Sequence, residues 1–186
     1  MFTHSSEAHV SVDIETLGVK PGCVILSIGA CSMFNDGNAA RVFHVAINTE
    51  DQVNNHGLLI DPATQAWWAA DERKDARRGL FDSRLELATV LGWFNKFLAS
   101  LAGERRLLVW AKSPSFDCAI LKAGYAATGI DCPWIFRDER DVRTAVAMAS
   151  IIAPEFAGTV HNALDDARHQ ALCVEAAYRK VTGTPL

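Results

Sequence analysis

Three apolar segments, separated by turn signals, occupy the first 47 residues and constrain the fold more than any other feature of the chain. Alternating and β-branched residues predict strands over residues 9–14, 24–34 and 41–47. The connecting sequences GVKPG and NDGN are typical of turns. Short connections of this kind join antiparallel neighbours. The chain is therefore predicted to open with an antiparallel meander.

The rest of the chain alternates between helical and strand patterns. The sequence RRLLVWA at 105–111 predicts a buried strand, and residues 132–151 hold a short strand followed by a helix. The polar segment 48–61 is predicted as a long loop. Further helices are predicted over 62–81, 83–101 (with Ser83 as N-cap and Glu86 completing a capping box), 113–129 and 161–183. This order predicts an α/β domain with a mixed central sheet.

Length and composition favour one soluble domain over residues 1–186, because 49% of its residues are hydrophobic. The five cysteines are odd in number and form no C-x-x-C pair, so we interpret them as small core residues. No apolar stretch approaches the roughly 20 residues that span a bilayer, and the N-terminus lacks a secretory signal. We therefore expect a cytoplasmic protein without a membrane partner.

A net charge of −4 gives the chain no general affinity for polyanions. A polyanionic substrate would need local arginines or bound cations. Two acids in the first strand favour bound cations as the source of positive charge. Asp13 and Glu15 lie two residues apart, so their side chains project from the same face of a strand. Two such charges repel unless a hard divalent cation lies between them. The alternative is an edge strand with both acids in water.

A third acid, Asp117, follows the strand 105–111, where a polar turn gives way to a helix that begins near Ser115 or Asp117. Loops at the ends of central strands are where α/β sheets build their sites. The alternative is an acid that only stabilises a helix N-terminus.

Two more acids, Asp165 and Asp166, open the last predicted helix. At about 100° per residue, one stripe of this helix collects its apolar side chains: Ala163, Leu164, Ala167, Ala171, Val174, Tyr178 and Val181. Asp166 lies near the edge of this stripe, whereas Asp165 lies almost opposite it. Asp166 is therefore predicted to reach an interior site, and Asp165 to face solvent.

His161 is predicted to lie in a loop just outside the helix, because Asn162 is a good N-cap. Histidine titrates near neutrality, which suits it to take a proton from water. The alternative is a histidine that only caps the helix or packs in the core.

Together these motifs resemble the DEDDh family of 3′-to-5′ exonucleases, which includes polymerase proofreading subunits, oligoribonuclease and ribonuclease T. The resemblance rests on DIETLG at 13–18, SFD at 115–117 and HNALDDA at 161–167, and it covers nearly the whole chain. The sequences IETLG, VILSIGAC and TQAWWAADERKDAR also resemble the exonuclease VIII-like, prophage exoribonuclease-like subgroup.

The resemblance implies a ribonuclease H-like fold, in which a five-stranded mixed β-sheet is flanked by α-helices, and two Mg²⁺ or Mn²⁺ ions. Asp13 would bridge both ions, Glu15 and Asp166 would complete one set of ligands, and Asp117 would serve the other ion. His161 would be the general base. The implied activity is hydrolysis of single-stranded DNA or RNA from the 3′ end, with release of nucleoside 5′-monophosphates.

Substrate contacts implied by the resemblance are Thr16 and Leu17, with Leu17 as a wedge against the last base. Trp67 and Trp68 point about 100° apart on a helix, so we expect one in the core and the other as a stacking surface. Arginines and a lysine are further candidates for phosphate contacts: Arg73, Lys74, Arg77, Arg78, Arg137, Arg140 and Arg143. Asp138 and Asp141 are interpreted as structural acids, and the alternative for Asp141 is a place at the border of the site, in the stretch RDVRT.

Two other functions are compatible with the same fold. One is a nucleic-acid-binding module without catalysis, which the complete set of acids disfavours. The other is a metal-dependent hydrolase of other phosphate esters. The choice between DNA and RNA stays open, since no reader of the 2′-hydroxyl is identifiable. A homodimer is compatible with the sequence but not required by it.

Overall fold

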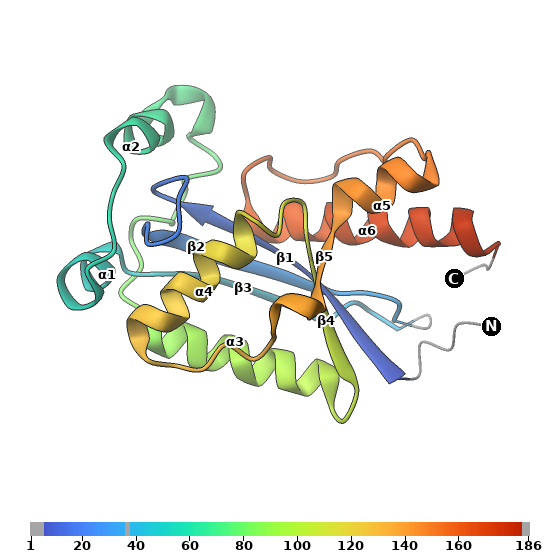
Figure 1. Ribbon diagram of the computed structural model, residues 1–186. Helices are drawn as coiled ribbons and strands as arrows, with labels where there is room; N and C mark the ends of the chain where they lie inside the picture. Colours follow the sequence, from blue (N-terminus) through green and yellow to red (C-terminus); the bar gives the residue numbers. More distant parts are fainter. Residues whose placement is uncertain (1–5, 36–37, 184–186) are drawn as a thin grey trace.

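Five strands form one mixed sheet in the order β3-β2-β1-β4-β5 (Figure 1). The computed structural model describes residues 6–35 and 38–183. The strands are β1 Glu7–Thr16, β2 Ile25–Ser32, β3 Val42–Ala46, β4 Arg106–Ala111 and β5 Glu139–Asp141. The first three are antiparallel, and β4 and β5 run parallel to β1. The predicted opening meander is confirmed, although residues 36 and 37 of the predicted NDGN turn lie outside the described residues.

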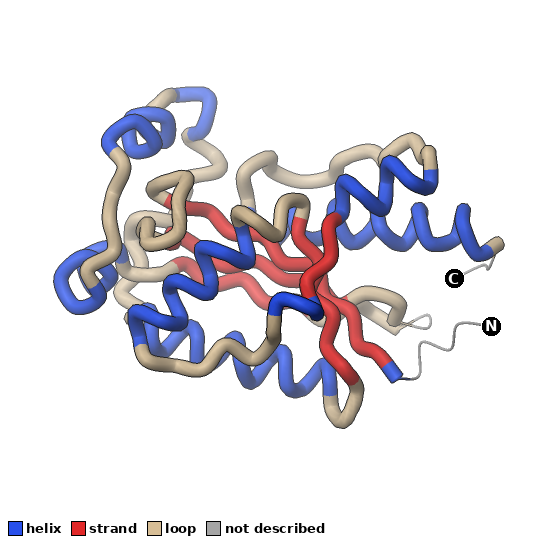
Figure 2. Tube along the Cα trace, in the orientation of Figure 1, coloured by secondary structure: helices blue, strands red, loops and turns tan. Residues whose placement is uncertain are grey.

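Helices cover both faces of this sheet (Figure 2). They are α1 Thr49–His56, α2 Pro62–Ala69, α3 Leu87–Ala102, α4 Asp117–Thr128, α5 Val142–Ala149 and α6 Ala163–Thr182, with short 3₁₀ turns at Asp71–Arg73 and Phe136–Asp138. On one face α3 and α4 pack over the larger hydrophobic core, and on the other α5 and α6 enclose a smaller one. The predicted α/β layering is confirmed.

Strand β1 lies at the centre of the sheet, paired with β2 on one side and β4 on the other. Val10, Val12 and Ile14 point into the larger core. The alternating positions Asp13 and Glu15 therefore point to the opposite face, which α6 covers. The alternative of an edge strand with both acids in water is wrong, because β1 is an interior strand of the sheet, Glu15 is buried and Asp13 is partly buried.

The predicted loop over 48–61 is also wrong, since α1 occupies most of it. Asn48 caps this helix by accepting hydrogen bonds from the Glu50 and Asp51 amides, and Gly57 ends it in the left-handed conformation. Its buried side chains are polar. Gln52 bonds both the amide and the carbonyl of Ile25. A helix held by such hydrogen bonds lacks the apolar stripe from which hydrophobic periodicity predicts a helix.

Helix α3 begins at Leu87 rather than at the predicted Ser83. The hydroxyl of Ser83 instead donates to the Ala46 carbonyl at 2.7 Å, and Glu86 makes no side-chain cap. The Leu87 amide donates to Asp51 of α1 at 2.9 Å. The cap of α3 thus comes from another helix. The helix predicted over 62–81 likewise ends at Ala69 and continues as 3₁₀ and turn structure.

All five cysteines are free, and four of them are buried, in agreement with a role as small core residues. Cys132 is partly exposed. Across residues 6–35 and 38–183, no helix has both the length and the apolar character that crossing a membrane requires.

Candidate active site

A pocket of about 810 Å³ opens where β1 and β4 end, between α2 and the start of α6. All five predicted catalytic residues line it together: Asp13, Glu15, Asp117, His161 and Asp166. They come from β1, the start of α4, and the turn and first helical residues of α6. Residues more than 150 positions apart in the sequence thus share one site.

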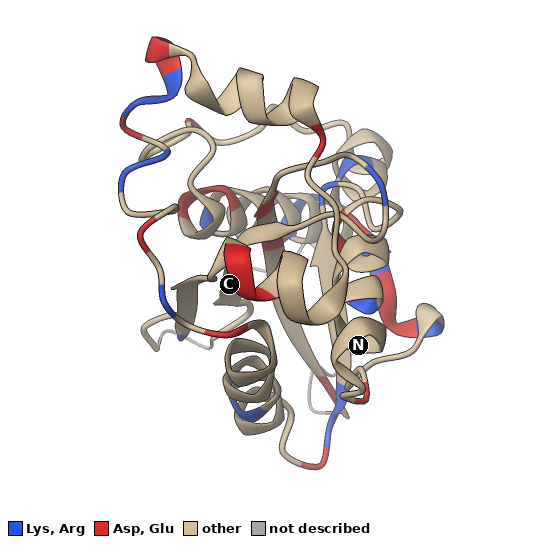
Figure 3. Ribbon diagram, turned by 90° about the vertical axis from the view of Figure 1, so that its left-hand side faces the viewer, with Lys and Arg blue, Asp and Glu red and all other residues tan. Residues whose placement is uncertain are grey.

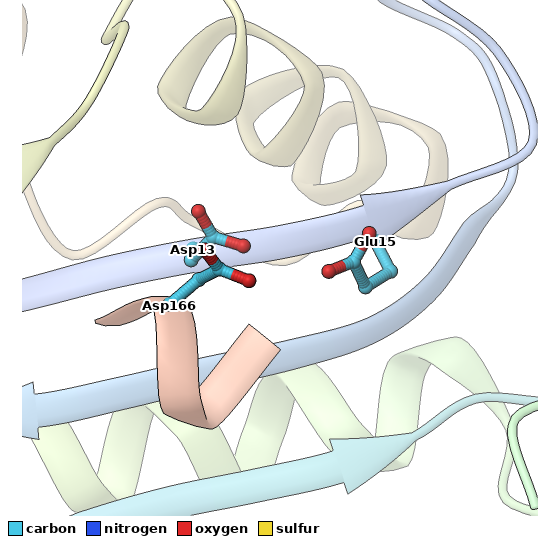
Figure 4. A group of neighbouring side chains, drawn as sticks. All are labelled: Asp13, Glu15 and Asp166. Atoms are coloured by element: carbon cyan, nitrogen blue, oxygen red, sulfur yellow. The ribbon is translucent and has the colours of Figure 1, made fainter. Parts of the chain in front are cut away.

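Asp13, Glu15 and Asp166 form its acidic centre (Figure 4). One carboxylate oxygen from each lies within 4.8 Å of the others. Glu15 is buried, and Asp13 and Asp166 are partly buried. In Figure 4 the carboxylates of the strand and of the helix point into the same small space. The predicted helical register, in which Asp166 turns inward, is therefore confirmed.

A glycine on the neighbouring strand allows α6 to come this close. Gly29 of β2 pairs directly with Asp13 in the sheet register. A Cβ atom at Gly29 would overlap the backbone of Ala163 and Leu164, in the first turn of α6. The absence of a side chain at residue 29 therefore leaves room for the first turn of α6 beside β2, next to Asp13.

The turn before α6 places His161 on the pocket wall. Asn162 caps the helix by accepting from the Leu164 and Asp165 amides, as predicted. His161 lies outside the helix with a φ of 64°, in the left-handed region. Its amide donates to Asp166 Oδ2 at 2.9 Å. The side chain is exposed and its ring lies 4.9 Å from the Trp67 ring, in a T-shaped arrangement.

Asp117 is 5% exposed and begins α4, as predicted. Burial raises the pKa of Asp117 to about 7, against the opposing effect of hydrogen bonding from the Ile14 backbone. Ile14 lies between Asp13 and Glu15 in β1, so this contact ties Asp117 to the acidic strand. The alternative in which Asp117 serves only the helix N-terminus does not account for its contact with β1.

The electrostatics of the acids fit a site for cations. Burial, followed by repulsion from Asp166 and Asp117, raises the pKa of Glu15 to about 8. Burial and then Asp117, Glu15 and Asp166 raise the pKa of Asp13 well above its usual value. Carboxylate oxygens are the preferred ligands of Mg²⁺ and Mn²⁺, and a bound cation relieves both penalties. The donor set therefore fits hard divalent cations.

Gln170 is a site residue that the sequence did not reveal. It is 2% exposed, lies one turn after Asp166 on α6, and donates to Asp13 Oδ1 at 2.6 Å. This bond lowers the pKa of Asp13, against the larger effect of burial. Its only signal in the sequence is the four-residue spacing from Asp166, which puts both side chains on one face of the helix.

Asp165 differs from its prediction. Its side chain is 22% exposed, so it is not fully turned to solvent. Asp165 Oδ2 accepts a hydrogen bond from the Thr159 amide at 2.9 Å, and Oδ1 lies 3.5 Å from Arg168. The helical wheel correctly excluded Asp165 from the acidic centre. It could not show that the preceding loop folds back over this carboxylate.

The two tryptophans differ in burial as expected, although both line the pocket. Trp68 is 2% exposed and its indole donates to the Thr16 carbonyl at 2.9 Å, whereas Trp67 is 37% exposed on the pocket wall. The Arg73 guanidinium lies 3.7 Å from the Trp67 ring centre and covers one face. Only the remaining ring surface of Trp67 can meet a base.

The two residues after the first acidic motif lie in different environments. Thr16 lines the pocket, and its hydroxyl donates to the Gly18 carbonyl. Leu17 is 1% exposed and packs in the larger core, so the structure does not place it as a wedge. Its amide bonds the Val24 carbonyl, and its carbonyl accepts from Asp61, which turns the side chain inward. The apolar side chain at the rim is instead Val19, which is 64% exposed.

Basic residues are interspersed with acids along the segment after α2 (Figure 3). Arg77 donates to the Trp68 and Ala70 carbonyls, and Arg140 to the carbonyls of Arg137 and Glu139. The cations that line the pocket are Lys112 and Arg143. The sequence singled out Arg143 but not Lys112.

The two acids predicted as structural have that role. Asp138 pairs with Arg106 at 2.8 Å, and Asp141 caps α5 through the Thr144 amide at 2.6 Å. Asp138 thus forms an ion pair, and Asp141 caps a helix.

The raised pKa values predict how stability depends on pH in the metal-free protein. An acid with a higher pKa in the folded state binds more protons when folded, so stability falls as pH rises between the two pKa values. For Glu15 this interval runs from 4.5 to about 8. Melting temperatures in EDTA are expected to fall across it, and Mn²⁺ is expected to restore stability at pH 8. A melting temperature that stays constant from pH 5 to 8 would contradict this.

Asp13→Asn supplies the control for that experiment. Asparagine removes one charge from the acidic centre and keeps an oxygen that can accept from Gln170. At pH 8 without metal, this variant is expected to melt at or above the wild-type temperature and to gain less from Mn²⁺. A melt well below that of the metal-free wild type would reveal a structural role for Asp13.

Comparisons with known proteins agree with this geometry. Two solved nucleases share the fold. CRN-4, cell-death related nuclease 4, aligns with a TM-score of 0.66 at 14% identity, over 92% of this chain and 64% of its own. The nuclease domain of 3′hExo, described as a DEDDh family member bound to rAMP, aligns with a TM-score of 0.62 at 12% identity, over 96% and 94%. No curated protein sequence matches the chain.

At these identities the two structures establish the fold alone, and they confirm the predicted α/β architecture of a five-stranded mixed sheet flanked by helices. The chain spans 64% of the CRN-4 chain. The exonuclease VIII-like assignment stays a prediction. The sequence model of the Rv2179c-like 3′-5′ exoribonuclease domain matches residues 8–178, which is nearly the whole chain. The chain therefore belongs to the Rv2179c-like 3′-5′ exoribonuclease family.

Proposed function

We propose that this protein is a metal-dependent 3′-5′ exonuclease, with residues 1–186 forming one catalytic domain. It hydrolyses single-stranded nucleic acid from the 3′ end and releases nucleoside 5′-monophosphates. RNA is the expected substrate, in line with the family description. The observation that supports this most is the convergence of four carboxylates and His161 on one pocket.

Four residues would hold the cations: Asp13, Glu15, Asp117 and Asp166. Asp13 is central among them, because Glu15 and Asp166 lie beside it and Asp117 contacts the same strand. Divalent cations, when bound, lower the pKa of a water molecule and stabilise the leaving 3′-oxygen. Gln170 fixes the Asp13 carboxylate by donating a hydrogen bond to Oδ1 at 2.6 Å.

His161 would act as the general base. Its side chain is exposed on the pocket wall beside Asp166, where a water molecule has access. The hydrogen bond from its backbone amide to Asp166 fixes the backbone. The neighbouring Trp67 ring limits the rotation of the imidazole. The imidazole would accept a proton from the water as its oxygen attacks the phosphorus and the P–O3′ bond breaks. The 3′-oxygen of the shortened chain would then take a proton from solvent and leave as a hydroxyl.

The rest of the pocket would hold the 3′-terminal nucleotide. Val19 and the free part of Trp67 offer apolar surface for a base. Lys112 and Arg143 supply positive charge for the phosphates on a protein of net charge −4. These contacts would orient the last phosphodiester over the acids.

The direct test uses oligonucleotides labelled at the 5′ end. Single-stranded RNA is expected to give a ladder that shortens from the 3′ end with Mg²⁺ or Mn²⁺, and no products with EDTA or with Asp13→Asn. Chromatography should identify nucleoside 5′-monophosphates, and a 3′-phosphate block should slow the reaction. The rate on DNA of the same sequence, compared with the rate on RNA, measures the preference for ribose or deoxyribose.

Two outcomes would remove the proposal. Binding of the oligonucleotide by folded protein without shortening, with either metal, would indicate a binding module. Hydrolysis of small phosphate esters without shortening of either polymer would indicate a different phosphoesterase.

A further inference from the structure

The carboxylate of Asp165 holds the turn that carries His161. This turn runs from residue 158 to 162 and joins the loop after α5 to α6. Asp165 Oδ2 accepts from the Thr159 amide at 2.9 Å. The Asn162 amide in turn donates to the Thr159 carbonyl at 3.1 Å, which closes the turn. His161 is thus fixed between one residue bonded to Asp165 and another that caps α6.

The backbone of this turn is unfavourable by itself. His161 adopts a φ of 64°, which costs free energy for a residue with a side chain. Such a conformation persists only where neighbouring contacts hold it. Two contacts do so from α6: the Asp165 carboxylate at Thr159 and the Asp166 carboxylate at the His161 amide. The two consecutive acids therefore hold two positions of the same turn, Thr159 and His161.

Gly158 shows how closely the turn fits the Asp165 carboxylate. Its φ is +125°, and a Cβ atom there would lie 2.5 Å from Asp165 Cγ. The backbone thus passes directly over the carboxyl group, at a distance that a side chain would prevent. This residue is matched to Asp165 rather than to the pocket.

We propose that Asp165 is a positioning residue for His161, which it directs at the reacting water by holding the 158–162 turn. The two consecutive acids then have different roles. Asp166 faces the cations, and Asp165 fixes the position of the general base. This inference rests on the proposed function, in which His161 acts as that base. It assigns a role to an acid that lies outside the acidic centre.

The test compares substitutions that keep or remove the oxygen at residue 165. Asp165→Ala is expected to lower kcat about 10- to 100-fold, as a displaced catalytic group does. KM should change less than about twofold. The Mn²⁺ affinity, measured by calorimetry, should also change less than about twofold, because the metal ligands are not altered. Asp165→Asn should keep most activity, since its amide oxygen still accepts from Thr159.

Two further variants separate the turn from the general stability of the helix. Gly158→Ala is expected to reproduce the loss of kcat, because its methyl group overlaps the Asp165 carboxyl. Arg168→Ala is the matched control: it removes the exposed partner of Asp165 Oδ1 and leaves the Thr159 bond intact, so activity should stay near wild type. Thermal melts establish that each variant is folded. If Asp165→Ala does not fold, Gly158→Ala carries the test.

A double-mutant comparison decides the mechanism. With His161→Ala as the background, a second change at residue 165 or 158 is expected to cost less than about twofold, because there is no base left to position. An equal loss in both backgrounds would overturn the proposal, as would wild-type kcat in Asp165→Ala. His161→Ala with wild-type activity would instead refute the histidine base of the proposed function, which distinguishes the two failures.

Discussion

Asp166→Asn is expected to lower turnover at least about a hundredfold, because it neutralises a carboxylate that would hold a cation together with Asp13 and Glu15. The change alters a carboxylate whose oxygen lies within 4.8 Å of theirs. Asp165→Asn, one position earlier, is expected to change turnover less than about threefold, because an amide oxygen can still accept from Thr159. The pair is a matched comparison, since both changes convert an acid to its amide in the same helical turn.

The measurement is kcat on 5′-labelled RNA at saturating Mn²⁺, with Mn²⁺ affinity from calorimetry. Asp166→Asn should also weaken metal binding, whereas Asp165→Asn should leave it unchanged. The reverse order of the two variants would show that Asp165 is the ligand. It would also mean that α6 has a different register in the active protein.

The orientation of three acids could be predicted from local periodicity, whereas their convergence in one site was implied by the resemblance to the exonuclease family. Strand alternation puts Asp13 and Glu15 on one face, and the helical angle separates Asp166 from Asp165. Asn162 marks where α6 begins, which fixes the positions of Asp165 and Asp166 on the helix. These rules act over a few residues, so they hold independently of how the rest of the chain folds.

The features that the sequence did not predict depend on contacts between distant segments. Helix α1 is held by hydrogen bonds from Gln52 to Ile25, and α3 is capped by Asp51 of that same helix. The bond between Gln170 and Asp13 joins residues 157 positions apart. No local pattern records such pairings.

Leu17 illustrates the limit of inference by resemblance. The motif correctly located its backbone beside the pocket, where Thr16 and Gly18 both line the wall. It could not determine the direction of the side chain, which the hydrogen bonds of Leu17 to Val24 and Asp61 turn into the core. A motif thus predicts position better than orientation wherever the chain leaves a strand.

Gly29→Ala is expected to have an effect as large as the loss of Asp166, although residue 29 bears no functional group. The added methyl group would overlap the backbone of Ala163 and Leu164, and backbone atoms cannot rotate away as a side chain can. Helix α6 must therefore move from the sheet, and Asp166 with it. A displacement of about 1 Å at a catalytic centre can cost about a hundredfold in rate. Overpacking of this kind also typically costs about 1–3 kcal/mol of stability.

Gly92→Ala provides the matched control, because the same methyl group meets nothing within 4 Å at that point of α3. There the change should stabilise the protein by up to about 1 kcal/mol, as alanine exceeds glycine in helix propensity. Urea unfolding, Mn²⁺ affinity and kcat are measured for both variants. Gly29→Ala should lose stability, metal affinity and turnover together, since one helix shift causes all three losses. A folded Gly29→Ala protein with wild-type Mn²⁺ affinity would show that the approach of α6 to β2 does not set the geometry of the acidic centre.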